Sequence, residues 1–147
     1  MHWFSNPYNA AALIVAAKKW LGTPFAPYQC AQGLGVDCVQ LAGALMVAGG
    51  VLERQPHFGA YSLDLAAHTK REMITEWLVN SERFYLLDGV LGVGDVITFR
   101  IGKAVNHVGV MISDRDFIHS IQGARVSEST LDDVTWGSRV ASYWRAF

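Results

Sequence analysis

The sequence predicts an α+β fold, with helices in the first half of the chain and an antiparallel sheet in the second. Apolar residues recur at helical spacing up to about residue 82, and after Gly94 they alternate with polar residues at a period of two. Helices followed by a block of strands are typical of this class. At 147 residues, the chain is expected to form one domain spanning residues 1–147.

The first helix is expected from about Ala10 to Leu21. Asn9 is a candidate N-cap, and Gly22 follows the last turn. The run AAALIVAA has the length of the apolar part of a signal peptide, but its two lysines follow it instead of preceding it. We therefore interpret it as a buried helix. The stretch GTPFAPYQCAQGLG, rich in Gly and Pro, is expected to be a loop.

The second helix is expected from about Cys38 to Ala48. Asp37 is the candidate N-cap, because its carboxylate can accept hydrogen bonds from the free N–H groups of the first turn. Gly49 and Gly50 end the helix. Its apolar residues lie nearly all round the helix, which predicts a central position in the fold.

A third helical pattern, from about Leu63 to Glu82, follows the loop RQPHFGAYS. Its apolar stripe favours packing in the core over a role as a ligand platform. The stripe consists of Met73, Ile74, Trp77 and Leu78. His57 and His68 lie in or beside this region and are expected to be solvated.

Five segments of the second half are expected to be strands. They are DVITFRI, HVGVMIS, FIHSI, RVSES and RVASYWRAF. Ser129 and Thr130 are expected to start a short helix before the last of these strands. Tyr143 and Trp144 are expected to pack that last strand against the core.

Composition excludes several classes of function. The net charge of −1 gives no electrostatic basis for binding nucleic acid or an anionic membrane surface. No apolar run approaches the roughly 20 residues that cross a bilayer. The N-terminus has no basic region and is interrupted by Pro7, so no standard signal peptide is expected. Cys30 and Cys38 form neither a disulfide framework nor a close-spaced zinc pair.

Cys38 is a candidate nucleophile because it stands at the first turn of a helix. Free N–H groups and the helix dipole favour a thiolate there, although the negative charge of Asp37 opposes it. The alternative from the sequence is a small buried apolar residue. Cys30 is expected to be a partly buried loop thiol, with a redox partnership to Cys38 as the lesser alternative.

His107 and His119 are candidates for a base and its orienting partner. His107 alternates with Gly109 and so points away from the strand face that carries the valines. If the turn between the strands has an odd number of residues, the even spacing places both histidines on one face. A tight hairpin would still leave the rings too far apart for a hydrogen bond, so a bulge or a wider turn is expected. A thiol, a base and an orienter are the parts of nucleophilic acyl transfer.

The motifs WLGTPF, GVDCVQL, GVGDVITF, NHVGVMI and FIHS occur in this order, followed by Val126 and by YWR near the C-terminus. This order resembles the NlpC/p60 family of papain-like cysteine peptidases of the bacterial cell wall, closest to the branch from phage and phage-like tail clusters. The resemblance implies a papain-like α+β core with a helical insertion at about residues 55–90. It implies Cys38 as nucleophile, His107 as base and acid, and His119 as the third polar residue.

The resemblance also implies a substrate and a route to it. The substrate would be a peptidoglycan stem peptide, commonly cut between D-glutamate and a diamino acid, with no cofactor or metal. Partners would be phage-tail or secretion-machine proteins, with no nucleic acid and no membrane span. The chain would be made in the cytoplasm and delivered to the cell envelope by a phage-like particle or another carrier.

Two departures from the family pattern concern the substrate side of the site. Val39 and Gln40 replace the usual Ser-Gly after the cysteine, and Gln40 could narrow the substrate groove beside Asp37. Phe25 stands near the place of a tyrosine that helps to bind the oxyanion in many members, and Tyr28 is a candidate substitute. The backbone N–H of the cysteine is the other natural donor.

Three alternatives remain open at this point. The first is a thiol acyltransferase or amidase on a lipid or protein, since another acceptor can replace water in the second step. The second is a zinc site formed by the candidate triad, although the chain has no close-spaced ligand pair. The third is a phage-tail module that has kept the fold and lost the activity.

Overall fold

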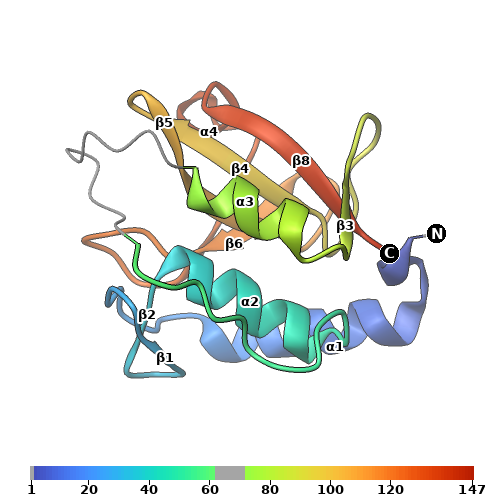
Figure 1. Cartoon of the computed structure of the whole chain (residues 1–147), viewed down its shortest axis with the longest axis horizontal. Helices are drawn as coiled ribbons and strands as arrows, with labels where there is room; N and C mark the ends of the chain where they lie inside the picture. Colours follow the sequence, from blue (N-terminus) through green and yellow to red (C-terminus); the bar gives the residue numbers. More distant parts are fainter. Residues whose placement is uncertain (1, 62–71) are drawn as a thin grey trace.

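The structure, a computed structural model, describes residues 2–61 and 72–147. In this part of the chain, six strands form one antiparallel sheet in the order β3-β8-β4-β5-β6-β7, and α2 and α3 pack on one face of it while α1 packs on α2 (Figure 1). The elements are η1 (Trp3–Ser5), α1 (Pro7–Trp20), β1 (Cys30–Ala31), β2 (Gly35–Val36), α2 (Cys38–Ala48), α3 (Met73–Asn80), β3 (Phe84–Leu86), β4 (Val96–Ile101), β5 (Ala104–Met111), β6 (Asp116–His119), β7 (Ser127–Thr130), α4 (Val134–Gly137) and β8 (Val140–Ala146).

Helix α1 begins three residues earlier than the sequence predicts. Asn6, not Asn9, is the N-cap, and its side chain accepts a hydrogen bond of 2.9 Å from the backbone N–H of Tyr8. Pro7 occupies the first helical position, where its fixed φ is favourable and its missing N–H costs nothing. The proline therefore starts this helix, whereas the sequence analysis treated it only as an interruption.

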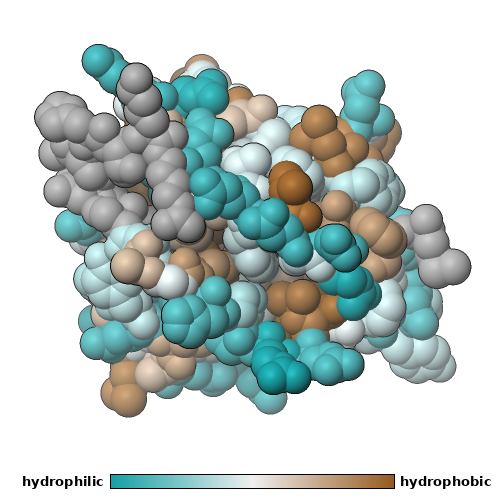
Figure 2. All heavy atoms as spheres, in the orientation of Figure 1, coloured by the Kyte–Doolittle hydropathy of each residue, from teal (hydrophilic) through white to brown (hydrophobic). Residues whose placement is uncertain are grey.

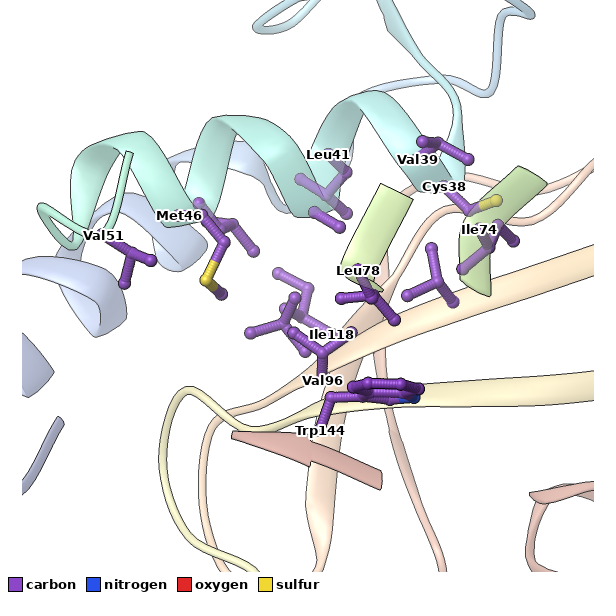
Figure 3. Packing of buried hydrophobic residues seen from close by; sticks show 14 of the residues in the cluster. Cys38, Val39, Leu41, Met46, Val51, Ile74, Leu78, Val96, Ile118 and Trp144 are labelled. Atoms are coloured by element: carbon purple, nitrogen blue, oxygen red, sulfur yellow. The ribbon is translucent and has the colours of Figure 1, made fainter. Parts of the chain in front are cut away.

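Helix α2 has the predicted bounds and the predicted N-cap. Asp37 accepts a hydrogen bond of 2.8 Å from the backbone N–H of Gln40, and Gly49 follows the last turn. Leu41, Leu45 and other apolar side chains of α2 are buried in the main core cluster, so the central position is confirmed (Figure 3). The helix thus presents its first residue to the interior of the molecule.

Helix α3 confirms the predicted apolar stripe over a shorter span. Met73, Ile74 and Leu78 are buried, and the half-buried Trp77 ring packs against Phe58 with their centroids 5.3 Å apart. The earlier part of the predicted helix, with His68, lies outside the described residues. The organisation of residues 1–147 as one domain, with an insertion at about 55–90, stays a prediction.

The sheet contains the five predicted strands, with corrections at its periphery. Ser129 and Thr130 belong to β7 instead of starting a helix, and the short helix α4 comes later, with Asp133 as its N-cap. Strand β3 was not predicted, and the predicted Gly- and Pro-rich loop contains the small β1–β2 hairpin. Trp144 of β8 is buried as expected.

Both faces of the sheet are covered, and each cover is apolar. On one face, Val108, Val110 and Ile118 join the cluster under α2 and α3. Figure 3 shows Ile118 in this cluster, between α2 and the sheet. On the other face a second cluster contains the buried side chains Ile97, Phe99, Met111 and Phe117, with Leu131, Trp136, Val140 and Tyr143 packed against it. The face to which His107 was assigned is therefore also a core face.

The outer surface is mixed in character. On the face shown in Figure 2, brown apolar patches are small and separated by teal polar side chains. Among the described residues, no helix combines the length and the apolar character needed to span a bilayer.

Candidate active site

Cys38 is buried at the first turn of α2, where it was predicted, but its environment does not favour a thiolate. The side chain is 3% exposed. Burial, reinforced by Asp37, raises the pKa of the thiol to about 12, although backbone N–H groups such as that of Val108 lower it. Desolvation thus outweighs the helix in this environment and opposes the thiolate that the helix N-terminus was expected to favour.

His107 on β5 is buried among aromatic rings. The ring is 3% exposed, and its centroid lies 5.5 Å from those of Phe99 and Trp136. Burial and the neighbouring His119 lower the pKa of His107 to about 3, and burial lowers the pKa of His119 to about 4. Burial therefore favours the neutral form of both imidazoles.

The two histidines meet by a diagonal contact across β5 and β6. His107 Nε2 lies 2.8 Å from His119 Nδ1. The ladder pairs Val110 with Ile118, so that His119 stands opposite Gly109, which is two residues along β5 from His107. Large rings can bridge such a diagonal, and Gly109 places no side chain between them. The predicted bulge or wider turn between the strands is therefore not needed.

The thiol and the imidazole line the same small pocket. Its volume is about 30 Å³, enough for one or two water-sized groups. Since His107 Nε2 is occupied by His119, its Nδ1 is the ring nitrogen that remains for a proton from Cys38. The pocket is lined by Phe25, Cys38, Ile101, Asn106, His107, Ser120, Ile121 and Gln122.

Two polar residues of the site were missed by the sequence analysis. Ser129 Oγ lies 2.8 Å from His119 Nε2, on the side of the ring away from His107. The predicted strand RVSES already contains Ser129, but Ser129 was also assigned to the start of a helix, and the sequence does not show that this strand pairs with β6. Asn106 also lines the pocket, and its Oδ1 is buried without a hydrogen-bond partner while its Nδ2 donates to the Ile101 carbonyl at 2.9 Å.

The sequence profile of the NlpC/P60 family matches residues 22–145. The chain belongs to this family. The match includes α2 and, except for Ala146 at the end of β8, all strands of the sheet from β3 to β8. A curated relative, the probable endopeptidase NlpC of Escherichia coli (strain K12), is 28% identical over 131 residues, which are 88% of this chain and 71% of the relative.

Solved structures of NlpC/P60 proteins share the fold, and the predicted papain-like α+β class is confirmed. A lipoprotein-like NLP/P60 protein of Staphylococcus aureus aligns over 97% of this chain with a TM-score of 0.65 and 16% identity. The NlpC/p60 domain of the peptidoglycan hydrolase SagA aligns over 94% with a TM-score of 0.59 and 16% identity. The chain spans 42% of the S. aureus protein but 98% of the SagA domain.

Asp37, Tyr28 and Gln40 belong to a network beside the pocket of Cys38. Asp37 is fully buried and accepts hydrogen bonds of 2.8 Å from the Tyr28 backbone N–H and 2.6 Å from the Tyr61 hydroxyl. The Gln40 amide donates to Tyr61 at 3.2 Å and accepts from Gln55 at 3.0 Å.

Tyr28 and Gln40 line a separate cavity of about 480 Å³. Tyr28 therefore does not line the pocket of Cys38, whereas Phe25 does.

The remaining candidates lie away from the pocket. Cys30 is a free, exposed thiol whose sulfur lies 3.8 Å from the Gln40 carbonyl, and His57 is exposed as expected. Within residues 2–61 and 72–147, no three His, Cys, Asp or Glu side chains are grouped as a metal site. His107 and His119 direct ring nitrogens at each other, an arrangement that does not leave both for one zinc ion.

Proposed function

We propose that this chain is a cysteine peptidase that hydrolyses amide bonds in peptidoglycan stem peptides. The observation that carries the proposal is the shared pocket of Cys38 and His107, in which His119 holds the second nitrogen of the imidazole. The family supports the substrate class, because relatives include a probable endopeptidase and a peptidoglycan hydrolase. The family alone would not say which side chains act.

The proposed reaction has two halves. Cys38 Sγ attacks the carbonyl carbon of the scissile amide, and its proton goes to His107 Nδ1. The backbone N–H of Cys38, at the start of α2, is the proposed hydrogen-bond donor to the oxyanion. His107 then gives the proton to the leaving amine, and water hydrolyses the thioester with His107 as base.

Proton transfer is expected to accompany the attack rather than to precede it. Burial raises the pKa of Cys38 to about 12 and lowers that of His107 to about 3, so the resting pair is a neutral thiol and a neutral imidazole. A neutral thiol and a neutral imidazole can be buried together without a counter-ion in the pocket. The mechanism then resembles general-base catalysis on a hydroxyl more than attack by a preformed thiolate.

The test is the release of amino groups from stem peptides of purified peptidoglycan. Cys38→Ala and His107→Ala should each lower the rate by at least about 1,000-fold, as expected for a nucleophile and its base. Cys30→Ser is the matched control and should keep the parent rate, because Cys30 is outside the pocket. Equal activity of Cys38→Ala and Cys30→Ser would overturn the proposal.

An added amine acceptor separates hydrolysis from transfer. If the parent protein forms the transferred product in preference to the free acid, the alternative of an acyltransferase replaces this proposal. If the parent protein releases no amine and forms no adduct with the peptide, the alternative of an inert module replaces it. Delivery to the cell envelope by a phage-like particle or another carrier stays part of the proposal, to be tested by locating the protein in such particles.

A further inference from the structure

Three side chains on adjacent strands form one line of hydrogen bonds. His107 Nε2 lies 2.8 Å from His119 Nδ1, and His119 Nε2 lies 2.8 Å from Ser129 Oγ. In the β6–β7 ladder Ser127 is opposite His119, so Ser129 reaches the ring on the diagonal, as His119 does with His107. Ser129 is therefore the far end of a line that begins at the candidate base.

The surroundings of His119 leave the serine as its polar partner. The ring centroid of Trp136 lies 4.7 Å from that of His119, and the ring centroid of Phe117 lies 4.8 Å from it. In the part of the chain that the structure describes, Ser129 Oγ is the recorded hydrogen-bond partner of His119 Nε2. Ser129 is half-buried on β7, the edge strand of the sheet next to β6.

The positions of the protons along this line decide whether His107 can act as a base. A neutral imidazole carries one N–H and one bare nitrogen. If His107 Nδ1 is bare, the proton of His107 is on Nε2 and is donated to His119 Nδ1. His119 then carries its proton on Nε2 and donates it to Ser129 Oγ. If the hydrogen bonds run the other way, Ser129 donates to His119 Nε2 and His119 Nδ1 donates to His107 Nε2. His107 Nδ1 then carries the proton of the neutral ring and cannot accept another.

We propose that Ser129 is a positioning residue which, by accepting a hydrogen bond from His119 Nε2, keeps His107 in the tautomer that can take the Cys38 proton. Charge on His107 strengthens this preference. When His107 becomes an imidazolium, both of its ring nitrogens carry protons. In the opposite arrangement the N–H groups of His107 Nε2 and His119 Nδ1 would then face each other, whereas in the proposed arrangement each N–H still has an acceptor. Ser129 neither gains nor loses a proton, which moves from Cys38 to His107 and then to the leaving amine.

The tautomers can be measured without substrate, by nitrogen-15 NMR of the histidine rings of the parent protein at neutral pH. Both His107 and His119 should show the Nε2–H tautomer. A His119 ring with its proton on Nδ1 in the parent protein would overturn the proposal, and this result needs no variant. The effect of Ser129 on His107 in catalysis rests on the proposed function, but the tautomer result stands even if the parent protein cleaves no peptide.

Variants test the role of the hydroxyl. Ser129→Ala should shift His119 toward a mixture of tautomers and lower kcat about 10- to 100-fold with KM unchanged, the range expected for losing a hydrogen bond to a charged group. Ser129→Thr keeps the hydroxyl and should restore both. Ser127→Ala on the same strand is the control. Parent-like tautomers and kcat in a folded Ser129→Ala protein would overturn the proposal.

Discussion

At the first turn of α2, two opposing effects act on the pKa of the Cys38 thiol. Free N–H groups at a helix start lower the pKa of a thiol, typically through about 0.3–1 kcal/mol of dipole interaction at an exposed site. Removing the charged form from water opposes this by a larger amount when the group is fully buried. The second effect wins at Cys38, since its pKa is raised to about 12.

This balance predicts how fast Cys38 reacts with iodoacetamide as the pH changes. In a Cys30→Ser background, the alkylation rate should rise with pH from about 6 to about 10 without a plateau, because below its pKa the thiolate fraction grows about tenfold per pH unit. Cys38→Ser, which retains only the exposed Cys30, should react faster at each pH. A plateau in the Cys30→Ser protein at neutral pH would indicate a preformed thiolate–imidazolium pair instead.

Single residues were predictable where their role is local. Asp37 and Cys38 follow from the cap signal at the start of a helix, which depends on neighbours within four residues. Ser129 was not predictable in the same way. Its contact with His119 depends on the register between β6 and β7. The neighbouring residues of β7, Ser127 and Glu128, are polar, and a polar strand specifies its register only weakly.

At the scale of elements, the loop before residue 62 is attached to the start of α2, which carries the candidate nucleophile. Tyr61 donates to Asp37 at 2.6 Å and accepts from Gln40 at 3.2 Å, while Gln55 donates to the Gln40 carbonyl at 2.9 Å. Both ends of this network involve the first turn of α2. The Gln40 side chain, expected to narrow a groove, therefore serves as a link between the loop and the helix.

Removal of the Tyr61 hydroxyl should loosen that turn. In Tyr61→Phe, the buried Asp37 carboxylate loses a donor, so the free energy of unfolding should fall by about 1–3 kcal/mol, measured by urea denaturation. Tyr28→Phe is the matched control, because Tyr28 binds Asp37 through its backbone N–H and its side chain is 58% exposed. Equal stability of the two variants would contradict this role of Tyr61.

A second link joins the start of β4 to β8. Arg145 donates through Nε and Nη2 to the fully buried Asp95 at 2.9 Å and 2.7 Å, and Asp95 also accepts from the Gly92 backbone N–H at 2.8 Å. The carboxylate holds the pKa of Arg145 above its usual range. The pair thus fixes the loop that leads into the central strands.

Breaking this pair should be far more costly than breaking an exposed one. Arg145→Met leaves the Asp95 charge buried and unpaired, and should lower the free energy of unfolding by about 3–5 kcal/mol. Arg115→Met removes an ion pair with Asp132 whose side chains are 62% and 67% exposed, and should cost less than about 1 kcal/mol. Thermal unfolding followed by circular dichroism would compare the stability of the two variants. Similar losses of stability in both would contradict the role given to the Arg145–Asp95 pair.

Elements were predictable in proportion to their length and periodicity. Helix α2 and strands β4 and β5 have long repeated patterns, and their positions were predicted to within a few residues. The three-residue strand β3 has too few residues for a period, and it forms because β8 lies beside it. Short elements of this kind depend on tertiary partners that the local sequence does not show.

At the scale of the whole molecule, the candidate site lies where two cores meet. Cys38 belongs to the cluster under α2, whereas the histidine pair is packed among the aromatic rings of the opposite cluster. The sequence identified both strands and the helix, but it assigned the face of His107 to the outside. Trp136, which covers that face, follows His107 by 29 positions in the chain, and no local pattern predicts that it packs there.

Burying two neutral histidines should make the whole fold sensitive to acid. The unfolded chain binds protons on these rings below about pH 6.5, whereas the folded pKa values are about 3 for His107 and about 4 for His119. Since the unfolded state binds more protons between these limits, stability is present at neutral pH and is lost as the pH falls from about 6.5 toward 4.

The expected loss is up to about 1.4 kcal/mol per pH unit for each histidine. Urea denaturation at several pH values would measure the slope. His119→Gln should reduce the slope, because it removes one of the two buried rings that only the unfolded chain protonates. His57→Gln, which replaces an exposed ring, is the control variant. A parent protein whose stability does not change between about pH 7 and pH 5 would show that the folded and unfolded chains bind the same number of protons in this range, and would contradict the lowered pKa values of the two histidines.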